Sequence, residues 1–427
     1  MENFLVQTFT ISNHPIKNLK ENFKIQYIMG IGEFLCYITQ NDPITKMVFG
    51  IWCNSILGSI PKSAWSYTTS FRAIKKGLAI HRDGFSFFTL RHPFFFDCFY
   101  LLEKSQKNLH SDTYTFYTEK ICGFFSKKIL NYTYNFFKGI NNGEKLPDTL
   151  KQHREICQTF VNKNIKRVLI VATMSAGKST LVNALVGKKI SKVRATACTN
   201  KIHYIYNKPA KEGVMTFSDD KKLLYTNDYS LLLSESIHSI GVNFASSLSE
   251  ERICLLDTPG VNYNGDKSHR ELTRKAIREN KYDILLLVMN AQQLAIDDEK
   301  ELIEYIGKHC KQKIVGVLNQ CDAFKTSRDS ISVAMETCQQ MMNENNIKSP
   351  IVIPISAYTA YLCRQSSELG EYMDEEDASE YQFILNKMRK PYYNLPSYLP
   401  GVPKDIKIDS VIERSGISYL EHLILSV

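Results

Sequence analysis

One nine-residue segment constrains this chain more than any other: Ala172-Thr173-Met174-Ser175-Ala176-Gly177-Lys178-Ser179-Thr180. It directly follows the apolar run 168–171 and precedes a helical pattern over 181–186. A loop at such a strand-to-helix junction turns its backbone N–H groups and the positive end of the helix toward an anion. We therefore expect a phosphate-binding loop. Gly177 allows the backbone to approach the anion, Lys178 brings a positive charge to the β- and γ-phosphates, and the Ser179 hydroxyl is a ligand for Mg²⁺.

The surrounding pattern predicts the fold class. From residue 166 onward, short β-branched runs alternate with amphipathic helices; the runs are Arg167–Ala172, Ile253–Asp257, Ile284–Met289, Ile314–Leu318 and Ile351–Ile355. This alternation predicts an α/β domain with a mostly parallel sheet flanked by helices, as in P-loop GTPases. Over 16–138, apolar residues recur at three- and four-residue spacing, as in Phe23–Leu35 and Phe116–Ile129, which predicts helices.

We expect three parts in the chain: an all-helical domain over 1–140, a linker and helix over 141–165, and the α/β domain over 166–427. The first 165 of the 427 residues hold 20 Lys and Arg against 12 Asp and Glu, and 28 of the 48 aromatic residues precede Ile140. A basic, aromatic segment fits nucleic acid, an anionic membrane or a protein partner. The simpler interpretation, which we favour, is a helical domain with an aromatic core and solvated lysines.

The cysteines and the N-terminus bear on the compartment. The eleven cysteines include no CxxC pair, which argues against a disulfide framework or a cysteine zinc site and favours a reducing cytosol. Met1-Glu2-Asn3 has neither the basic head nor the apolar run of a signal peptide. We expect a cytoplasmic protein, with peripheral membrane contact as an open alternative. Phe94-Phe95-Phe96 and the basic, aromatic segment Lys127–Lys138 are the candidates to insert, although a place in the helical core is the preferred interpretation for both.

Three further motifs follow the loop in the order that a GTPase needs. Asp257-Thr258-Pro259-Gly260 ends a strand in a carboxylate for a Mg²⁺-bound water, and the Gly260 N–H senses a γ-phosphate. Asn319-Gln320-Cys321-Asp322 places a carboxylate that accepts two guanine N–H groups, which adenine cannot match. Ser356-Ala357 directs a backbone N–H to guanine O6, or else caps a helix.

A threonine is also needed to close over the metal and the γ-phosphate. The segment 194–199 offers Thr196 and Thr199. Thr196 is our choice, because a suitable loop separates it from the strand Ile202–Tyr206, and Thr199 stays open as the alternative. The predicted cofactors are therefore GTP and Mg²⁺.

These residues resemble the dynamin superfamily. Residues 172–180 have the SxGKS form of its phosphate loop, and Asn290–Asp298 is similar to the matching segment of bacterial dynamin-like GTPases. The likeness covers roughly 167–425. It implies a large GTPase that hydrolyses GTP with Mg²⁺ and is activated when its G domains pair as a homodimer. A second dynamin-like or stalk-bearing partner and peripheral membrane contact stay open as alternatives.

The resemblance implies a role for each matching residue. Ser175 contacts the region between the β- and γ-phosphates, Lys178 and Ser179 serve phosphate and Mg²⁺, and Thr196 orders the attacking water. The residues of the second switch and of the base site are Asp257, Gly260, Asn319 and Asp322. In the prediction, Ser175, Lys178 and Thr196 are catalytic and Ser179, Thr196 and Asp257 hold the metal. The remaining nucleotide contacts come from Ala172, Thr173, Met174, Ala176, Gly177, Thr180, Gln320, Ser356 and Ala357.

Four departures from the family pattern matter. The usual first loop glycine is Ala172. Met174 stands where many dynamins have a Gln that positions the catalytic water, and a thioether hydrogen-bonds weakly. Gln320 replaces the usual Lys. The chain also ends at Val427, just after the expected last helix of the domain, so that any helical lever is expected from 1–165.

Two other function classes remain open from the sequence. One is a nucleotide-gated scaffold with negligible hydrolysis, motivated by Met174 and Gln320. The other is an RNA- or ribosome-associated GTPase that uses the basic N-terminal segment. We rank it last and expect no nucleic-acid partner, because no RNA-binding signature is present.

Overall fold

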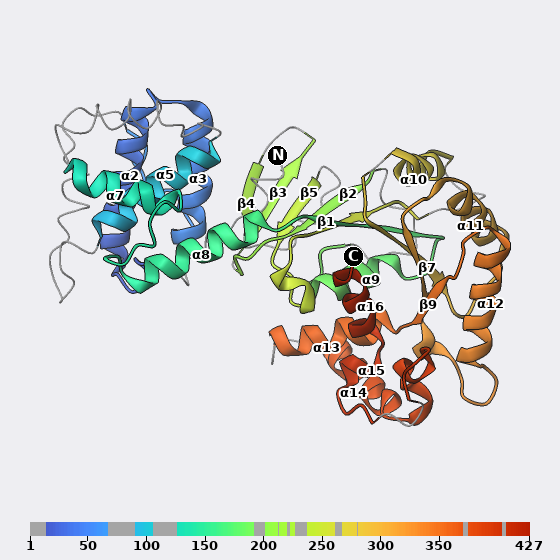
Figure 1. Cartoon of the computed structure of the whole chain (residues 1–427). Helices are drawn as coiled ribbons and strands as arrows, with labels where there is room; N and C mark the ends of the chain where they lie inside the picture. The colour runs from blue at the N-terminus through green and yellow to red at the C-terminus, as the bar shows by residue number, and fades with distance from the viewer. Residues whose placement is uncertain are drawn as a thin grey trace. The chain divides into compact units, whose positions relative to one another are not determined.

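The computed structural model describes residues 14–66, 90–105, 126–191, 201–211, 213–219, 223–226, 237–260, 267–279, 281–369, 375–403 and 407–427. The chain divides into two compact units. The first comprises residues 1–162 with 209–213, and the second comprises 163–208 with 214–427. Figure 1 shows the first as a group of helices and the second as a sheet with helices on its faces.

Helices form the described part of the first unit. They are α2 (Glu21–Ile38), α3 (Pro43–Leu57), α5 (Arg91–Lys104), α7 (Lys127–Phe137) and α8 (Asp148–Asn162). Helix α3 shows how local sequence sets such bounds. The Asp42 carboxylate accepts a hydrogen bond from the Thr45 N–H at 2.8 Å, Pro43 occupies the first turn, and Gly58 ends the helix with φ of 70°.

The aromatic residues of this unit form its core, as the preferred sequence interpretation predicted. Phe94, Phe95 and Phe96 are at most 1% exposed. Phe94 packs with Tyr27 and Phe34, Phe95 packs with Phe34, and Phe96 packs with Phe136 and Phe137. The alternative that Phe94–Phe96 inserts into a membrane is therefore wrong, since these rings already fill the helical core. The part of the predicted pattern that spans 116–125 lies outside the described residues.

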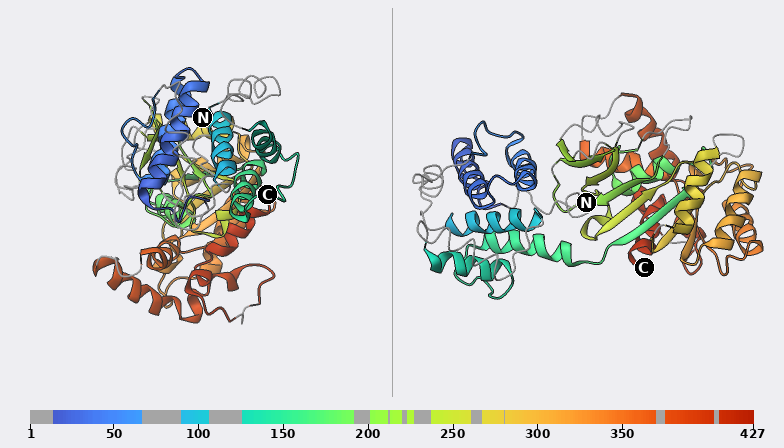
Figure 2. Two further views of the ribbon diagram at one scale, coloured as in Figure 1. Left: turned by 90° about the vertical axis from the view of Figure 1, so that its left-hand side faces the viewer. Right: turned by 90° about the horizontal axis from the view of Figure 1, so that it is seen from above.

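The second unit is built on a nine-stranded sheet with the order β4-β3-β5-β2-β6-β1-β7-β8-β9 (Figures 1 and 2). The strands are β1 (Lys166–Ala172), β2 (His203–Asn207), β3 (Val214–Ser218), β4 (Leu223–Thr226), β5 (Ile237–Val242), β6 (Ile253–Asp257), β7 (Ile284–Asn290), β8 (Lys313–Asn319) and β9 (Ile351–Pro354). The helices are α9 (Lys178–Val186), α10 (Lys267–Glu279), α11 (Asp297–His309), α12 (Ile331–Glu344), α13 (Ala357–Leu369), α14 (Glu375–Met388), α15 (Val411–Arg414) and α16 (Ile417–Leu425).

The prediction of a mostly parallel sheet is confirmed, with an antiparallel edge added. Strands β6, β1, β7, β8 and β9 pair in parallel throughout. Strand β2 runs antiparallel to β6, and β3 runs antiparallel to both β4 and β5. Strands β3, β4 and β5 were not predicted, because short strands between turns, with no intervening helices, lack the strand–helix alternation that marks the other strands.

Strand β1 shows how the sheet buries both faces. Val168 and Ile170 pack in one cluster with residues of α9 and α16. Leu169 and Val171 pack in another cluster with residues of α10, α11 and α12. Because successive side chains of a strand point to opposite faces, an uninterrupted apolar run is what a doubly covered central strand requires.

None of the helices in the described ranges combines the length and the apolar content needed to cross a bilayer.

Candidate functional site

The phosphate-loop segment lies where β1 ends and α9 begins. Ala172 is the last residue of β1 and pairs with Val288 on β7. The left-handed backbone positions come later, at Ser175 with φ of 62° and Gly177 with φ of 82°. Alanine therefore serves in place of the usual first glycine, because this position is an ordinary extended residue. Thr173 and Ala176 are buried, whereas Ser175 is exposed and Thr180 is half-buried in the first turn of α9.

Asn319 fastens this loop to the rest of the domain. Its side-chain Nδ2 donates to the Ala176 carbonyl at 3.0 Å, and its Oδ1 accepts from the Ala357 N–H at 3.0 Å. The side chain is 2% exposed. A Cβ atom at Gly177 would lie 2.3 Å from the Asn319 Nδ2. Gly177 is thus required both by its left-handed φ and by the close approach of this carboxamide.

Gln320 makes a second contact with the loop. Its Nε2 donates to the Ser175 carbonyl at 2.8 Å, and its backbone is left-handed with φ of 66°. Asn290, at the end of β7, directs its Nδ2 to the same carbonyl at 3.4 Å. Asn290 was not among the predicted site residues. Its position at the end of a core strand was the signal that it faces the loop.

Lys178 and Asp257 form a buried ion pair at the carboxyl ends of β1 and β6. The Lys178 side chain is 9% exposed and the Asp257 side chain 6% exposed. The Ser191 hydroxyl, which the sequence analysis did not single out, lies 3.4 Å from the other carboxylate oxygen. A phosphate group would have to draw the Lys178 ammonium away from this carboxylate.

Two of the three oxygen donors predicted for Mg²⁺, Ser179 and Asp257, are in the described part of the chain, and their chemistry suits that ion. The Ser179 hydroxyl is half-buried and makes no hydrogen bond to another described residue. The Asp257 carboxylate is a second oxygen donor. It is ion-paired with Lys178, the residue that precedes Ser179. Hydroxyl and carboxylate oxygens are the ligands that Mg²⁺ prefers in proteins.

The structure brings the Asp257–Gly260 segment to the loop. The Thr258 hydroxyl donates to the Ile170 carbonyl of β1 at 2.8 Å. A Cβ atom at Gly260 would lie 3.5 Å from Met174 Cγ, which places the apolar Met174 side chain against this glycine. The residue that replaces the family's usual Gln therefore stands beside the predicted γ-phosphate sensor.

The predicted base-binding residues follow β8 and β9. Asp322 is half-buried, and its carboxylate accepts no hydrogen bond and forms no ion pair within the described part of the chain. Ser356 caps α13, since its hydroxyl accepts from the Thr359 N–H at 3.2 Å. The Ser356 N–H donates to the Ser415 carbonyl at 2.9 Å, and the Ala357 N–H is held by Asn319. A contact from either N–H to guanine O6 stays a prediction. For such a contact to form, the Ser356 or the Ala357 N–H would have to break or share its present hydrogen bond.

The two threonine candidates, Thr196 and Thr199, lie outside the described residues.

Comparison with known families classifies this site. Residues 168–321, which run from β1 through the phosphate loop to Cys321, match the model of the dynamin family. The chain contains a dynamin-family P-loop GTPase domain.

Two curated relatives are similar to part of the chain. A probable chloroplastic transmembrane GTPase, FZO-like, of Arabidopsis thaliana is 25% identical over 207 residues, covering 47% of this chain and 20% of the relative. A bacterial dynamin-like protein of Nostoc punctiforme is 23% identical over 272 residues, covering 58% of this chain and 37% of the relative. The chain thus spans well under half the length of these two relatives.

Two solved structures were also matched. A chain of an oligomerised bacterial dynamin pair is 17% identical, with a TM-score of 0.37, covering 93% of this chain and 60% of the other. Era of Aquifex aeolicus, bound to GDP and aluminium fluoride, is 18% identical, with a TM-score of 0.29, covering 58% of this chain and 62% of the other.

Within the dynamin-family domain, His203 is a neighbour of the site that the sequence analysis missed. It begins β2 and pairs with Asp257 across the antiparallel ladder. Burial lowers the pKa of the His203 imidazole, while the Asp257 carboxylate acts in the opposite direction. Only the strand pairing reveals this histidine, since 53 residues, which include β3, β4 and β5, separate it from Asp257 in the chain.

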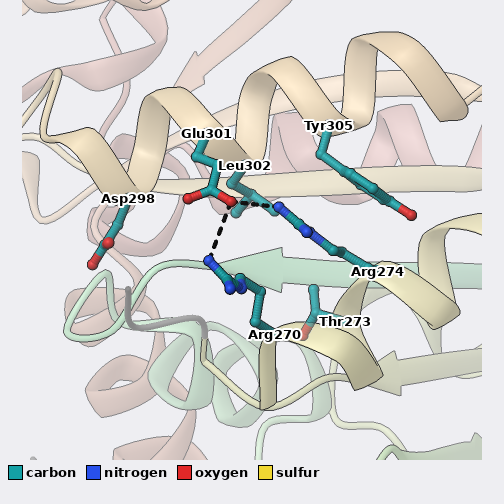
Figure 3. Close-up of a pocket in the computed structure, with 7 residues that line it drawn as sticks. All are labelled: Arg270, Thr273, Arg274, Asp298, Glu301, Leu302 and Tyr305. Atoms are coloured by element: carbon teal, nitrogen blue, oxygen red, sulfur yellow. Dashed lines mark hydrogen bonds and ion pairs between the residues drawn. The ribbon is translucent and has the colours of Figure 1, made fainter. Parts of the chain in front are cut away.

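A shallow pocket lies between α10 and α11 of the same domain (Figure 3). Arg270 and Arg274 reach from α10 to the Glu301 carboxylate on α11, Arg270 at 3.3 Å. The Arg274 guanidinium also lies over the Tyr305 ring, 4.8 Å from its centre. One carboxylate therefore holds two arginines on the helix that follows the Asp257–Gly260 segment.

Proposed function

We propose that this chain binds GTP together with Mg²⁺ and hydrolyses it to GDP and phosphate. The observation that carries the proposal is the buried Lys178–Asp257 ion pair next in the chain to the Ser179 hydroxyl, which bonds no described residue, after a loop with two left-handed residues. A buried ammonium and carboxylate at this junction are costly unless something uses them. Phosphate and a divalent cation are the ligands that would take over the two partners.

The proposed chemistry is positioning and charge stabilisation. Backbone N–H groups of the loop and the Lys178 ammonium would bind the β- and γ-phosphates, and Ser175 would contact the region between them. Ser179 and Asp257 would hold Mg²⁺, together with Thr196. When bound, the ion supplies charge neutralisation to the phosphates. Thr196 would also orient the attacking water, and the Gly260 N–H would sense the γ-phosphate.

Base selection is assigned to Asp322. Its open carboxylate would accept the N1–H and N2–H of guanine, while adenine would leave it without donors. Asn319 and Gln320 would act indirectly, because both side chains hold the loop. We expect GTP to be preferred over ATP for this reason.

We further propose that pairing of two GTPase domains stimulates hydrolysis. Arg270 and Arg274 are already engaged by Glu301, so neither is poised to reach a phosphate of its own domain. A second, stalk-bearing dynamin-like partner, a cytoplasmic location and peripheral membrane contact belong to the same proposal. The aromatic core of the first unit supports treating the helical segment, proposed as 1–140, as a domain of its own.

The test is GTP turnover by the full chain and by Lys178→Ala, with Lys311→Ala as a control at an exposed lysine. Loss of the ammonium from the phosphates should lower turnover by about 100-fold or more, as removal of one charge-stabilising group does elsewhere. The control should match the wild type. Unchanged turnover in Lys178→Ala would refute the proposal. Specific activity that rises with protein concentration would support pairing, and a constant value would exclude it.

Met174 favours a second candidate, a nucleotide-gated scaffold that hydrolyses GTP negligibly. The thioether lies against Gly260, where it can neither donate a hydrogen bond nor accept one strongly. Turnover at saturating GTP separates the two candidates. A rate no greater than that of Lys178→Ala, with GTP still bound, would establish the scaffold, and Met174→Gln would then be expected to raise the rate.

A further inference from the structure

Three metal-ligating side chains meet inside the helical unit. His14 precedes α2, Asp97 lies on α5 and His153 lies on α8, and their ligand atoms are all within 4.8 Å of one another. The three residues are 2%, 0% and 1% exposed. The fold thus brings two imidazoles and a carboxylate together from widely separated parts of the chain, in a core that is otherwise aromatic and aliphatic.

Hydrogen bonds account for only one oxygen of the central carboxylate. Asp97 Oδ2 accepts from the Tyr27 hydroxyl at 2.6 Å and lies 2.9 Å from His14 Nε2. Asp97 Oδ1 is buried and has no hydrogen-bond partner in the described ranges. A buried polar atom without a hydrogen-bond partner destabilises the fold, and a charged one does so more than a neutral one. Such an oxygen indicates a ligand that the side chains alone do not supply.

The surroundings restrict what that ligand can be. The His153 ring lies 5.1 Å from that of His14 and 5.6 Å from that of Phe96, and the Trp52 ring lies 6.5 Å from His14. Among the described residues, aromatic rings on these sides offer few polar groups to hold the several waters that an octahedral ion keeps. A small cation with few ligands, mainly nitrogen and oxygen, suits the site better.

We propose that His14, Asp97 and His153 form a structural site for a divalent transition metal, with Zn²⁺ as the preferred ion. Two imidazole nitrogens and one carboxylate oxygen match the tetrahedral preference of Zn²⁺, and the Tyr27 oxygen lies beside them as a fourth. Metal–ligand distances of about 2.0–2.2 Å would bring the ligand atoms to roughly 3.3 Å from one another. The ligand atoms now lie within 4.8 Å of one another, and side-chain rotation would bring them closer together around the cation. The positive charge of the cation would offset the buried Asp97 charge.

The site would join the two ends of the helical unit. His14 lies at the start of its described part, and His153 lies on α8, the last helix before β1. A shared metal would therefore stabilise α8 against α5 and the segment before α2. This proposal concerns the first unit alone and does not depend on nucleotide chemistry in the second.

The experiment uses the full chain, freed of nucleotide and Mg²⁺, dialysed against Zn²⁺ and then against metal-free buffer. Metal content is measured by mass spectrometry, and the ligands are identified by X-ray absorption at the zinc edge. Co²⁺ is then loaded in place of Zn²⁺, because tetrahedral Co²⁺ gives intense visible absorption bands. Three variants are compared: Asp97→Asn, His153→Gln and, as a histidine control outside the cluster, His92→Gln, whose ring bonds Thr133.

We expect about one Zn²⁺ per chain in the wild type and in His92→Gln, with nitrogen and oxygen ligands only, and at least a tenfold lower content in Asp97→Asn and His153→Gln. Chelation should lower the midpoint of thermal unfolding of the wild type and leave that of His153→Gln unchanged. Wild-type protein without retained metal, or with sulfur among the zinc ligands, would overturn the proposal even if the variants fail to fold. The cluster would then only hold the helices together through the hydrogen bonds of Asp97 to Tyr27 and His14.

Discussion

Replacement of Asn319 by alanine tests whether one buried carboxamide holds the candidate nucleotide site together. The side chain bridges the Ala176 carbonyl and the Ala357 N–H, each at 3.0 Å, and both of these residues are fully buried. Asn319→Ala removes two hydrogen bonds and leaves a carbonyl and an N–H stranded without water. Asn319→Asp keeps the acceptor for Ala357 but turns a carboxylate oxygen toward the Ala176 carbonyl.

The magnitude follows from these contacts. Each net hydrogen bond contributes about 1 kcal/mol, and each stranded buried partner costs about 1–3 kcal/mol. Since the two contributions overlap, we expect Asn319→Ala to lower the free energy of unfolding of the GTPase unit by about 3 kcal/mol. Asn319→Asp should cost at least as much. The control is Gln320→Ala, which loses one exposed bond to the Ser175 carbonyl and should cost about 1 kcal/mol or less.

Urea unfolding of the full chain measures these differences. Because the two units need not unfold together, the relevant transition is the one that Mg-GDP shifts to higher urea. Calorimetry with GTP adds a second measurement, and Asn319→Ala should weaken binding more than Gln320→Ala does. If Asn319→Ala is no more destabilising than Gln320→Ala, the bridge does not hold the loop and our account of the site is wrong.

Three further predictions concern single residues. Gly177→Ala should abolish GTP binding measured by calorimetry, because its Cβ would meet Asn319 in a left-handed backbone; binding at wild-type affinity would contradict this. Burial raises the pKa of the Glu299 carboxyl from 4.5 to about 7. The protonated carboxyl therefore contributes stability that is fully present below pH 4.5, and up to about 3 kcal/mol of the free energy of unfolding is lost as the pH rises through 7. Glu299→Gln keeps the acceptor for the Ala295 N–H and should stabilise the protein at about pH 8 in urea unfolding; an unchanged pH dependence would refute the assignment. Arg364→Met leaves the Glu421 carboxylate, 1% exposed, without its ion-pair partner and should cost about 3–5 kcal/mol, most of which Glu421→Leu should restore in the double variant. If the two single effects simply add, the pair is not coupled.

Motifs that are defined by the order of neighbouring residues were predicted from the sequence alone. A strand followed by Gly177-Lys178-Ser179 specifies a loop at a helix start, since the same few residues set both backbone and charge. The core strands β1, β6, β7, β8 and β9 were predicted within one or two residues, because a doubly covered parallel strand needs a continuous apolar run. The aromatic core of the helical unit was likewise foreseen from spacing.

The sequence pattern did not predict contacts between segments that are distant in the chain. Nothing in the sequence around Ser191 or His203 indicates that each lies beside Asp257. The antiparallel strands β3, β4 and β5 were missed because their register depends on partners elsewhere in the sheet. The roles assigned to Ser175, Thr196 and Asp322 stay predictions.

The sequence by itself determined which chemistry the phosphate loop can offer, since that depends on residue types within one turn of chain. Only the tertiary structure decided what holds the loop, through Asn319, Gln320 and Asn290, and what gathers His14, Asp97 and His153. The physical reason is that these contacts join residues that lie tens of residues apart in the chain. The short stretch of sequence around each residue does not specify which distant residue will lie next to it in space.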